Sequence, residues 1–266
     1  MKQFKLNINT KTQKYPIIIG RGLLNDLPKL LKHNSLYFTK YLIVIDNKIK
    51  KKVILRILKK FNKKNIITFL FNANEKNKNQ KNVDKILAVL LKNNFQRNDC
   101  LISVGGGITG DVSGFASSIY KRGINFVNIP TTLLAQVDSS IGGKTGINTS
   151  FGKNLIGSFY QPKLVISDID FLKTLPKREI ICGYAEIFKH SLIFEKKFFS
   201  FLDKNANEIL NLKSPFIEKS IVKSCEIKKK IVELDEKEKS LRKILNFGHT
   251  FAHAYESSLN YSKRLN

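Results

Sequence analysis

The chain has 266 residues, 42% of them hydrophobic, and its 47 lysines and arginines against 21 acidic residues give a formal net charge of +26. This apolar content is enough for a buried core and excludes a wholly disordered chain, and no apolar run approaches the roughly 18 residues of a membrane span. The lysines lie among asparagines and isoleucines without any zinc-finger, helix-turn-helix or RNA-binding pattern, so we expect neither a nucleic acid nor a membrane as partner.

Strands and helices alternate through the first two thirds of the chain. Short apolar runs predict strands at residues 4–8, 16–19, 41–45, 66–71, 100–104, 126–129 and 164–169. Apolar residues at three- and four-residue spacing predict helices at 23–32, 49–60, 83–94 and 111–119. This alternation is typical of an α/β fold, with a Rossmann-like parallel sheet covered by helices on both faces.

The pattern changes near residue 170, after which no strand is indicated. Helical spacing predicts four helices, at 180–194, 198–210, 215–234 and 241–259. We therefore divide the chain into an α/β domain at residues 1–170 and an all-helical domain at residues 171–266. Because no flexible Gly/Ser linker separates them, the domains should pack closely and place catalysis in the cleft between them.

Three cysteines, Cys100, Cys182 and Cys225, are far apart and form no CxxC pair, and the first residues contain no apolar signal region. Disulfide bonds are not indicated, which is typical of a reducing compartment. We expect a cytoplasmic protein.

A glycine turn follows the strand at 100–104. Gly105, Gly107 and Gly110 satisfy GxGxxG, in which missing Cβ atoms let a pyrophosphate approach backbone N–H groups. The acidic residue of a dinucleotide site is expected about 20 positions downstream. Here Asp111 directly follows the glycines and the strand-end acid Asp46 lies upstream, so this motif alone does not indicate a conventional dehydrogenase.

Two helical segments carry side chains with metal-ligand character. Glu186 and His190 are four residues apart, as are His249 and His253, so each pair shares one helix face. A catalytic zinc needs three protein ligands and an open position. A lone pair of histidines at this spacing is more often coincidental than a metal site, so the ligand set stays open on these residues alone.

A succession of longer phrases is more specific. They are SVGGGITGD at 103–111, YKRG at 120–123, IPTTLLAQVDSS at 129–140, GGKTG at 142–146, GKNLIG at 152–157, FYQP at 159–162, LKTLP at 172–176, GYAE at 183–186 and LRKILNFGHTFAHA at 241–254. In this order and spacing they resemble the 3-dehydroquinate synthase family of sugar-phosphate cyclases. The resemblance covers essentially the whole chain.

The resemblance implies a lyase of the shikimate pathway of aromatic amino acid biosynthesis. It would use NAD and a divalent metal, Zn or Co, to convert a small phosphorylated keto acid, 3-deoxy-D-arabino-heptulosonate 7-phosphate, into 3-dehydroquinate and phosphate, and it would act as a homodimer. Rival interpretations are a related cyclase that makes inosose or valiolone rings, an enzyme similar to glycerol dehydrogenase, and a non-catalytic NAD-binding remnant.

The resemblance also implies site residues. Catalytic or substrate-binding roles fall on Arg122, Asp138, Lys144, Asn154, Lys189, Lys228, Arg242, Asn246 and His253. Cofactor contacts fall on Asp46, Glu75, Lys78, Gly107, Ile108, Thr109, Gly110, Asp111, Thr131, Thr132, Lys144, Lys153, Phe171, Leu172, Lys173 and Thr174. Glu186 and His249 would be metal ligands. The turn that carries Glu75 and Lys78 lacks the leading Asp and Gly of the family pattern.

The family's third metal ligand is a histidine 17 positions after the first, where this chain has Asn266, its last residue. A neutral amide is a poor substitute for imidazole at zinc. We therefore expect a C-terminally truncated member, with an incomplete helical domain and impaired activity as a separate chain. A partial sequence, a truncated gene product and a chain completed by a second polypeptide all remain open.

Overall fold

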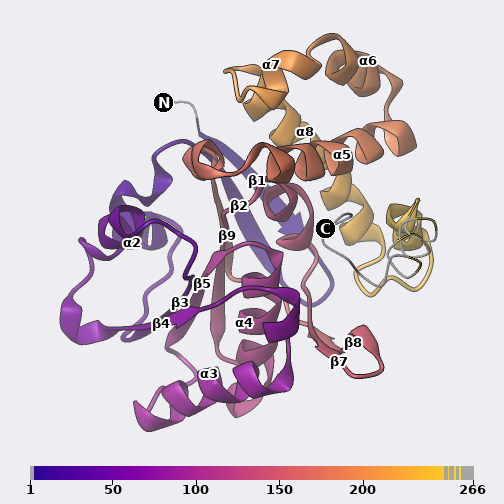
Figure 1. Ribbon diagram of the computed structural model, residues 1–266. Helices are drawn as coiled ribbons and strands as arrows, with labels where there is room; N and C mark the ends of the chain where they lie inside the picture. The colour runs from indigo at the N-terminus through magenta and orange to yellow at the C-terminus, as the bar shows by residue number, and fades with distance from the viewer. Residues whose placement is uncertain (1–2, 249–250, 252–254, 256–257, 259–266) are drawn as a thin grey trace.

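A seven-stranded sheet forms the centre of the molecule in the computed structural model, which describes residues 3–248, 251, 255 and 258 (Figure 1). Its strands are β1 (Phe4–Asn9), β2 (Lys14–Gly20), β3 (Tyr41–Asp46), β4 (Ile66–Phe71), β5 (Cys100–Gly105), β6 (Asn125–Pro130) and β9 (Leu164–Asp168). The strand order is β1-β2-β9-β6-β5-β3-β4. Only β1 and β2 are antiparallel; all other neighbours in the sheet are parallel. The predicted α/β class is confirmed.

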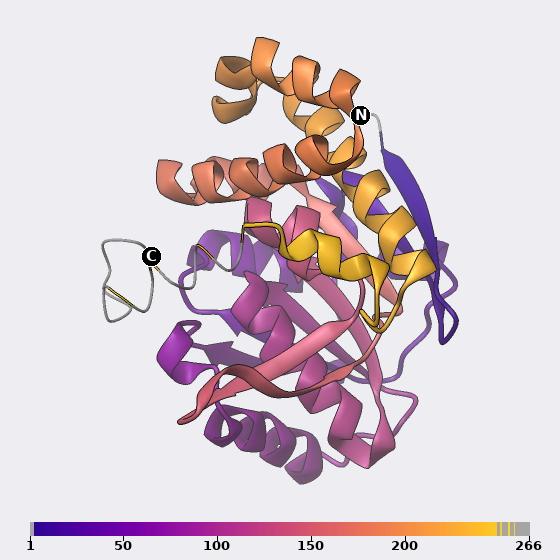
Figure 2. The same cartoon turned by 90° about the vertical axis from the view of Figure 1, so that its right-hand side faces the viewer.

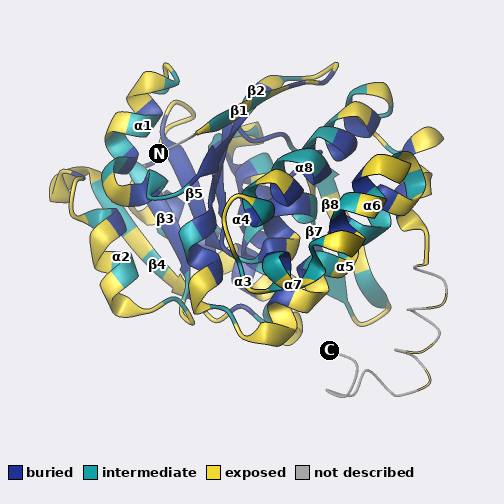
Figure 3. Cartoon of the chain, turned by 90° about the horizontal axis from the view of Figure 1, so that it is seen from above, coloured by how far each residue is buried: buried dark blue, intermediate teal, exposed yellow. Residues whose placement is uncertain are grey.

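Helices cover both faces of this sheet. They are α1 (Leu27–His33), α2 (Lys51–Leu58), α3 (Gln80–Lys92) and α4 (Gly107–Ile119), with short turns η1 (Leu23–Asp26), η2 (Lys63–Asn65), η3 (Glu75–Asn77), η4 (Tyr120–Arg122) and η6 (Ile169–Thr174). Alternate residues of β3 serve the two faces: Ile43 and Ile45 pack with α1 and α2, whereas Leu42 and Val44 pack with α3 and α4. Burial on both faces explains why the central strands are continuous apolar runs (Figure 3).

A helical layer lies against the β1–β2 side of the sheet. It contains α5 (Lys177–Phe194), α6 (Lys196–Lys204), α7 (Ala206–Leu210), α8 (Phe216–Leu234) and the 3₁₀ helix η7 (Leu241–Asn246). Ile8 and Ile17 of the sheet share a core with Ile187 of α5 and Ile221 and Ile231 of α8. Figure 2 shows α8 beside the β1–β2 hairpin. Within the described part of the chain no strand follows Asp168, and no helix is long and apolar enough to cross a membrane.

Three sequence expectations need correction. A hairpin of β7 (Lys144–Thr149) and β8 (Gly152–Phe159) was not predicted, because its glycines and polar residues do not alternate with apolar ones. The helix expected at 198–210 is divided at Asn205 into α6 and α7. The helix expected at 241–259 begins as the 3₁₀ helix η7, and most of its later residues lie outside the described ones. The division into domains at residue 170 stays a prediction.

Candidate active site

The glycine turn lies at the carboxyl edge of the sheet. β5 ends at Gly105, and α4 begins at Gly107 with Gly106 as its N-cap residue, which makes no side-chain hydrogen bond to the first turn. The first N–H groups of a helix have no partner within the helix and carry the positive end of its dipole. This terminus is therefore ready to receive an anionic group such as a pyrophosphate.

The predicted cofactor residues gather at the same edge. Asp46 ends β3, Glu75 and Lys78 follow β4, Thr131 and Thr132 follow β6, and Phe171–Thr174 lie in η6 after β9. The Thr131 N–H donates to the carbonyl of Gly105 (2.9 Å), which joins the turns after β5 and β6. Nucleotides bind at this edge of open parallel sheets. Lys144 and Lys153 lie instead on the β7–β8 hairpin.

The glycines leave space for a dinucleotide that a side chain would fill. A Cβ on Gly107 would stand 3.0 Å from Ser139 Oγ, and one on Gly106 would stand 3.2 Å from Thr132 Cγ2. Any larger residue would therefore crowd the entrance to the α4 terminus. The residues present fit NAD, because an uncapped helix terminus is combined with a bare backbone above it.

A cavity of about 620 Å³ opens next to this turn. The predicted residues that line it are Asp111, Asp138, Lys144, Asn154, Lys189, Lys228, Arg242 and Asn246. Among the described residues, four cationic and three acidic side chains line the cavity, with Glu238 as the third acid. These residues come from the hairpin, α4, α5, α8, η7 and the turn after β6. The fold thus brings together residues more than a hundred positions apart.

Asp138 reaches the cavity from a π-helical turn, η5 (Ala135–Ser139). Buried Gln136 fixes this turn, because its Nε2 donates to the carbonyls of Pro130 (3.3 Å) and Asp168 (3.0 Å). Lys228 of α8 contacts Asp138 Oδ1 and donates to the Asp138 carbonyl (2.6 Å). Burial alone would raise the pKa of Asp138, but the Lys228 ammonium outweighs it and lowers that pKa to about 2. Asp138 is therefore ionised at neutral pH.

Arg242 and Lys144 form the opposite wall. Arg242 is 2% exposed, and its Nη1 donates to the carbonyls of Gly142 (3.0 Å) and Glu236 (2.6 Å). Lys144 contacts the carboxylate of Glu238. Burial, with repulsion from Arg242 and then Lys228, nevertheless lowers the pKa of Lys144 to about 8. Lys144 therefore changes charge close to neutral pH.

This charge change gives a pH prediction. Lys144 is cationic below pH 8 and neutral above it, so the cavity should bind sulfate about tenfold more weakly at pH 9 than at pH 7. Sulfate keeps its own charge over this range, and calorimetric titration at several pH values measures the effect. Lys144→Arg stays charged and should remove the dependence. The same dependence in Lys144→Arg would show that another group is responsible.

Lys78 connects the cofactor side of the site with the substrate side. Its Nζ donates to Asp111 Oδ2 (2.6 Å) and also to Asn154 Oδ1. Burial raises the pKa of Asp111 to about 6, although Lys78 opposes the change. Asn154 has a φ of 58°, in the left-handed region that asparagine tolerates better than most residues. One buried ammonium thus holds two predicted site residues.

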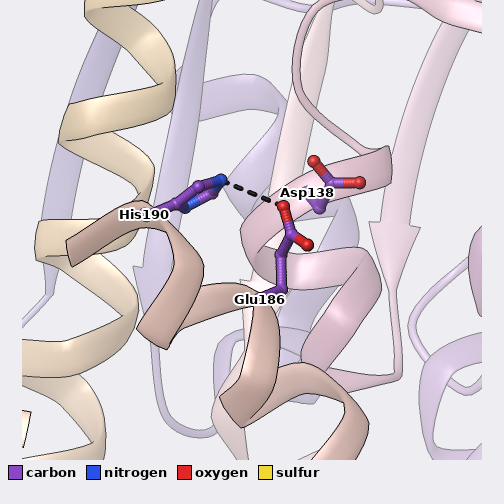
Figure 4. Close-up of side chains that lie close together, drawn as sticks. All are labelled: Asp138, Glu186 and His190. Carbon is purple, nitrogen blue, oxygen red and sulfur yellow. Dashed lines mark ion pairs between the residues drawn. The ribbon is translucent and has the colours of Figure 1, made fainter. Parts of the chain in front are cut away.

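Of the two predicted metal ligands, the structure describes Glu186 but not His249. Ligand atoms of Asp138, Glu186 and His190 lie within 4.8 Å of one another (Figure 4). The carboxylates of Asp138 and Glu186 are suitable donors for zinc or cobalt, and His190 Nε2 is buried 3.1 Å from Glu186 Oε1 without a well-formed hydrogen bond to a described residue. These residues fit a divalent metal. His249 and His253 lie outside the described residues, so their predicted roles stay predictions.

The predicted residue Arg122 lies away from the cavity, and several residues that line the cavity were not predicted. Arg122 is exposed in η4, at the end of α4 opposite the glycine turn, and does not line the cavity. Glu238 lines the cavity, contacts Lys144 and accepts a hydrogen bond from Asn246 Nδ2 (2.8 Å). The three acidic residues within 235–238, four positions before Arg242, were the available signal. The cavity lining of the hairpin, including Leu155 and Phe159, was missed with the hairpin itself.

Comparison with solved structures identifies the class. A 2-deoxy-scyllo-inosose synthase complexed with carbaglucose-6-phosphate, NAD⁺ and Co²⁺ matches with a TM-score of 0.87 and 26% identity, over 95% of this chain and 69% of that one. A 2-epi-5-epi-valiolone synthase from Streptomyces hygroscopicus subsp. jinggangensis 5008, with NAD⁺ and Zn²⁺ bound, matches with a TM-score of 0.83 and 26% identity, over 93% and 69% of the two chains. The fold is that of an α/β sugar-phosphate cyclase.

The sequence relatives narrow this class to one family. Residues 68–182 match the 3-dehydroquinate synthase N-terminal family and residues 183–265 match the C-terminal one. A 3-dehydroquinate synthase of Pelagibacter ubique (strain HTCC1062) is 63% identical over all of this chain and 72% of its own length. The chain belongs to the 3-dehydroquinate synthase family.

Proposed function

We propose that the chain is a 3-dehydroquinate synthase, a lyase that converts 3-deoxy-D-arabino-heptulosonate 7-phosphate into 3-dehydroquinate and phosphate. The observation that carries the proposal is the convergence of Lys144, Lys189, Lys228 and Arg242 on one cavity beside the uncapped terminus of α4. A substrate with a phosphate and a carboxylate needs such a cationic lining. This reaction would place the chain in the shikimate pathway.

NAD and the metal would occupy separate parts of the site. The turn Gly105–Asp111 would hold NAD, and Glu186 with Asp138 would contribute to the metal site. When bound, NAD would supply a reversible oxidation, and the metal would polarise a substrate oxygen.

The chain's own residues do the rest. The guanidinium of Arg242, held by two carbonyls, presents its remaining donors in a fixed orientation to an anionic substrate group. Lys144, which contacts Glu238, can gain or lose a proton near neutral pH, because burial and repulsion from Arg242 and Lys228 lower its pKa to about 8. Ionised Asp138 fixes Lys228 against the backbone. Together these residues orient a doubly anionic substrate before any bond changes.

Two further expectations belong to this proposal. We propose a homodimer, because Phe151 at the tip of the β7–β8 hairpin is 92% exposed and Leu155 beside it is 63% exposed, which is unusual for a surface that stays in water. Light scattering should give twice the mass of one chain. We also propose a cytoplasmic location, supported by the three free cysteines.

The choice among cyclases rests on substrate preference. With NAD⁺ and Zn²⁺ supplied, phosphate release from the heptulosonate phosphate should exceed release from glucose 6-phosphate at least about 100-fold, because only the former has a carboxylate for the cationic wall. The ratio tests the assignment even where absolute rates are low. Equal release from both substrates would favour an inosose-type cyclase. A non-catalytic remnant would bind NAD but little zinc.

A further inference from the structure

A fully buried pair of side chains connects α5 with α8 next to Glu186. His190 of α5 and Ser224 of α8 are both 0% exposed, and His190 Nδ1 lies 2.7 Å from Ser224 Oγ. Neither residue lines the cavity. Ile187 of α5 and Ile221 of α8, each three residues before a member of the pair, belong to one buried apolar core. Buried polar groups are nearly always hydrogen-bonded, so the geometry of this pair indicates which atom donates the hydrogen.

The surroundings decide which ring nitrogen carries the proton. If Nδ1 donated to Ser224, the bare lone pair of Nε2 would face Glu186 Oε1 at 3.1 Å, and two acceptors would repel each other. If Ser224 donates its hydroxyl proton to Nδ1, Nε2 carries the hydrogen and points it at the carboxylate. Only the second arrangement places a hydrogen atom between the two atoms of each contact. His190 is therefore a donor toward Glu186.

The contacts that begin at Ser224 and pass through His190 end at Glu186. Its Oε1 lies 2.7 Å from Lys189 Nζ and 3.1 Å from His190 Nε2, so two nitrogen atoms flank one carboxylate oxygen, although the geometry of neither contact is that of a good hydrogen bond. Figure 4 shows the Glu186 carboxylate facing both His190 and Asp138. The Nε2 contact is close but not yet well aligned, since Nε2 forms no good hydrogen bond to a described residue.

We propose that Ser224 and His190 are positioning residues, which hold one oxygen of Glu186 so that the carboxylate is presented to a divalent metal beside Asp138. This inference rests on the metal-dependent function proposed above. Carboxylate ligands of metals are usually hydrogen-bonded from behind, and losing such a partner typically weakens metal binding about 10- to 100-fold. His190 acts here through Glu186 and not as a ligand.

Two substitutions of His190 distinguish the effect of losing the Nε2–H donor from the effect of losing the imidazole ring. In His190→Asn, the amide replaces Nδ1 and can keep the Ser224 contact, but nothing reaches Glu186. In His190→Gln, the amide nitrogen lies as many bonds from the backbone as Nε2 and can still donate to Glu186. Zn²⁺ affinity is measured on the whole 266-residue chain by competition with a chromophoric chelator, and the visible absorption of bound Co²⁺ reports the ligand geometry.

His190→Asn should weaken Zn²⁺ binding about 10- to 100-fold and alter the Co²⁺ spectrum, whereas His190→Gln should stay within about threefold of the unaltered chain. Exposed His33 of α1 supplies the control, and His33→Asn should change nothing. If His190→Asn does not fold, Ser224→Ala carries the test and should weaken binding about tenfold. Unchanged affinity in His190→Asn, or in Ser224→Ala where that variant carries the test, would overturn the proposal, as would equal losses in the Asn and Gln variants.

Glu186→Gln distinguishes this proposal from the function on which it rests. If Glu186→Gln leaves Zn²⁺ affinity unchanged, the metal site assigned to the proposed function is wrong. If Glu186→Gln loses the metal while His190→Asn keeps it, only the positioning roles of His190 and Ser224 fail.

Discussion

Replacing Lys228 by Met should weaken binding of the heptulosonate phosphate at least about 100-fold, which corresponds to about 2.7 kcal/mol. The Lys228 side chain is 6% exposed, and its ammonium is paired with Asp138. Met preserves much of the volume but leaves the Asp138 carboxylate without its cation, so an attraction is lost and a repulsion toward the anionic substrate is gained. The pKa of Asp138 should rise as well. Calorimetric titration measures the affinity.

The neighbouring lysine provides a matched control. Lys229 is the next residue of α8, pairs loosely with Glu233 at 3.9 Å and does not line the cavity. Lys229→Met should bind the substrate within about twofold of the unaltered chain, since exposed ion pairs contribute little. Equal losses in the two variants would mean that net charge, and not the position of Lys228, governs binding.

Replacing Gly107 by Val should weaken NAD binding at least about 100-fold. The new Cβ would stand 3.0 Å from Ser139 Oγ, and the two methyl groups would cover the N–H groups at the start of α4. Ile119→Val, at the other end of α4, changes a partly exposed side chain and should leave NAD affinity unaltered. Unchanged NAD affinity in Gly107→Val, measured by calorimetry, would place the cofactor elsewhere.

Much of the fold could be predicted because local patterns and tertiary burial agree in the sheet. The run Leu42–Ile45 is apolar at every position because both faces of β3 are covered, and its type and limits follow from the sequence. The same holds for the glycine turn after β5, whose position between strand and helix is visible in the spacing of Gly105 and Gly107. Resemblance to a known family, and not periodicity, supplied most of the individual site residues.

The β7–β8 hairpin could not be predicted from periodicity because its geometry depends on contacts between the two strands. A Cβ on Gly146 would stand 2.7 Å from the Ile156 carbonyl, and one on Gly157 would stand 2.0 Å from the Thr145 carbonyl. These glycines allow the two backbones to approach closely, but a glycine-rich segment in a single sequence is normally interpreted as a loop. Missing the hairpin also hid part of the cavity wall.

The site shows a similar limit. Glu238, which lines the cavity, is a loop residue with a φ of 53°. No helical or strand periodicity in the sequence marks such a position. Arg122 illustrates the opposite case, because its phrase matches the family while its side chain lies at the far end of α4. Whether each side chain lines the cavity depends on which residues the fold brings close together, and this cannot be read from a single sequence.

The most direct measurement is calorimetric titration of the 266-residue chain, loaded with NAD⁺ and Zn²⁺, with 3-deoxy-D-arabino-heptulosonate 7-phosphate. The account predicts saturable binding of one substrate per chain, much tighter than the binding of sulfate and lost in Lys228→Met, because four cations converge on a single cavity. A substrate that binds no more tightly than sulfate, or equally well to Lys228→Met, would contradict the assignment of this cavity as the active site.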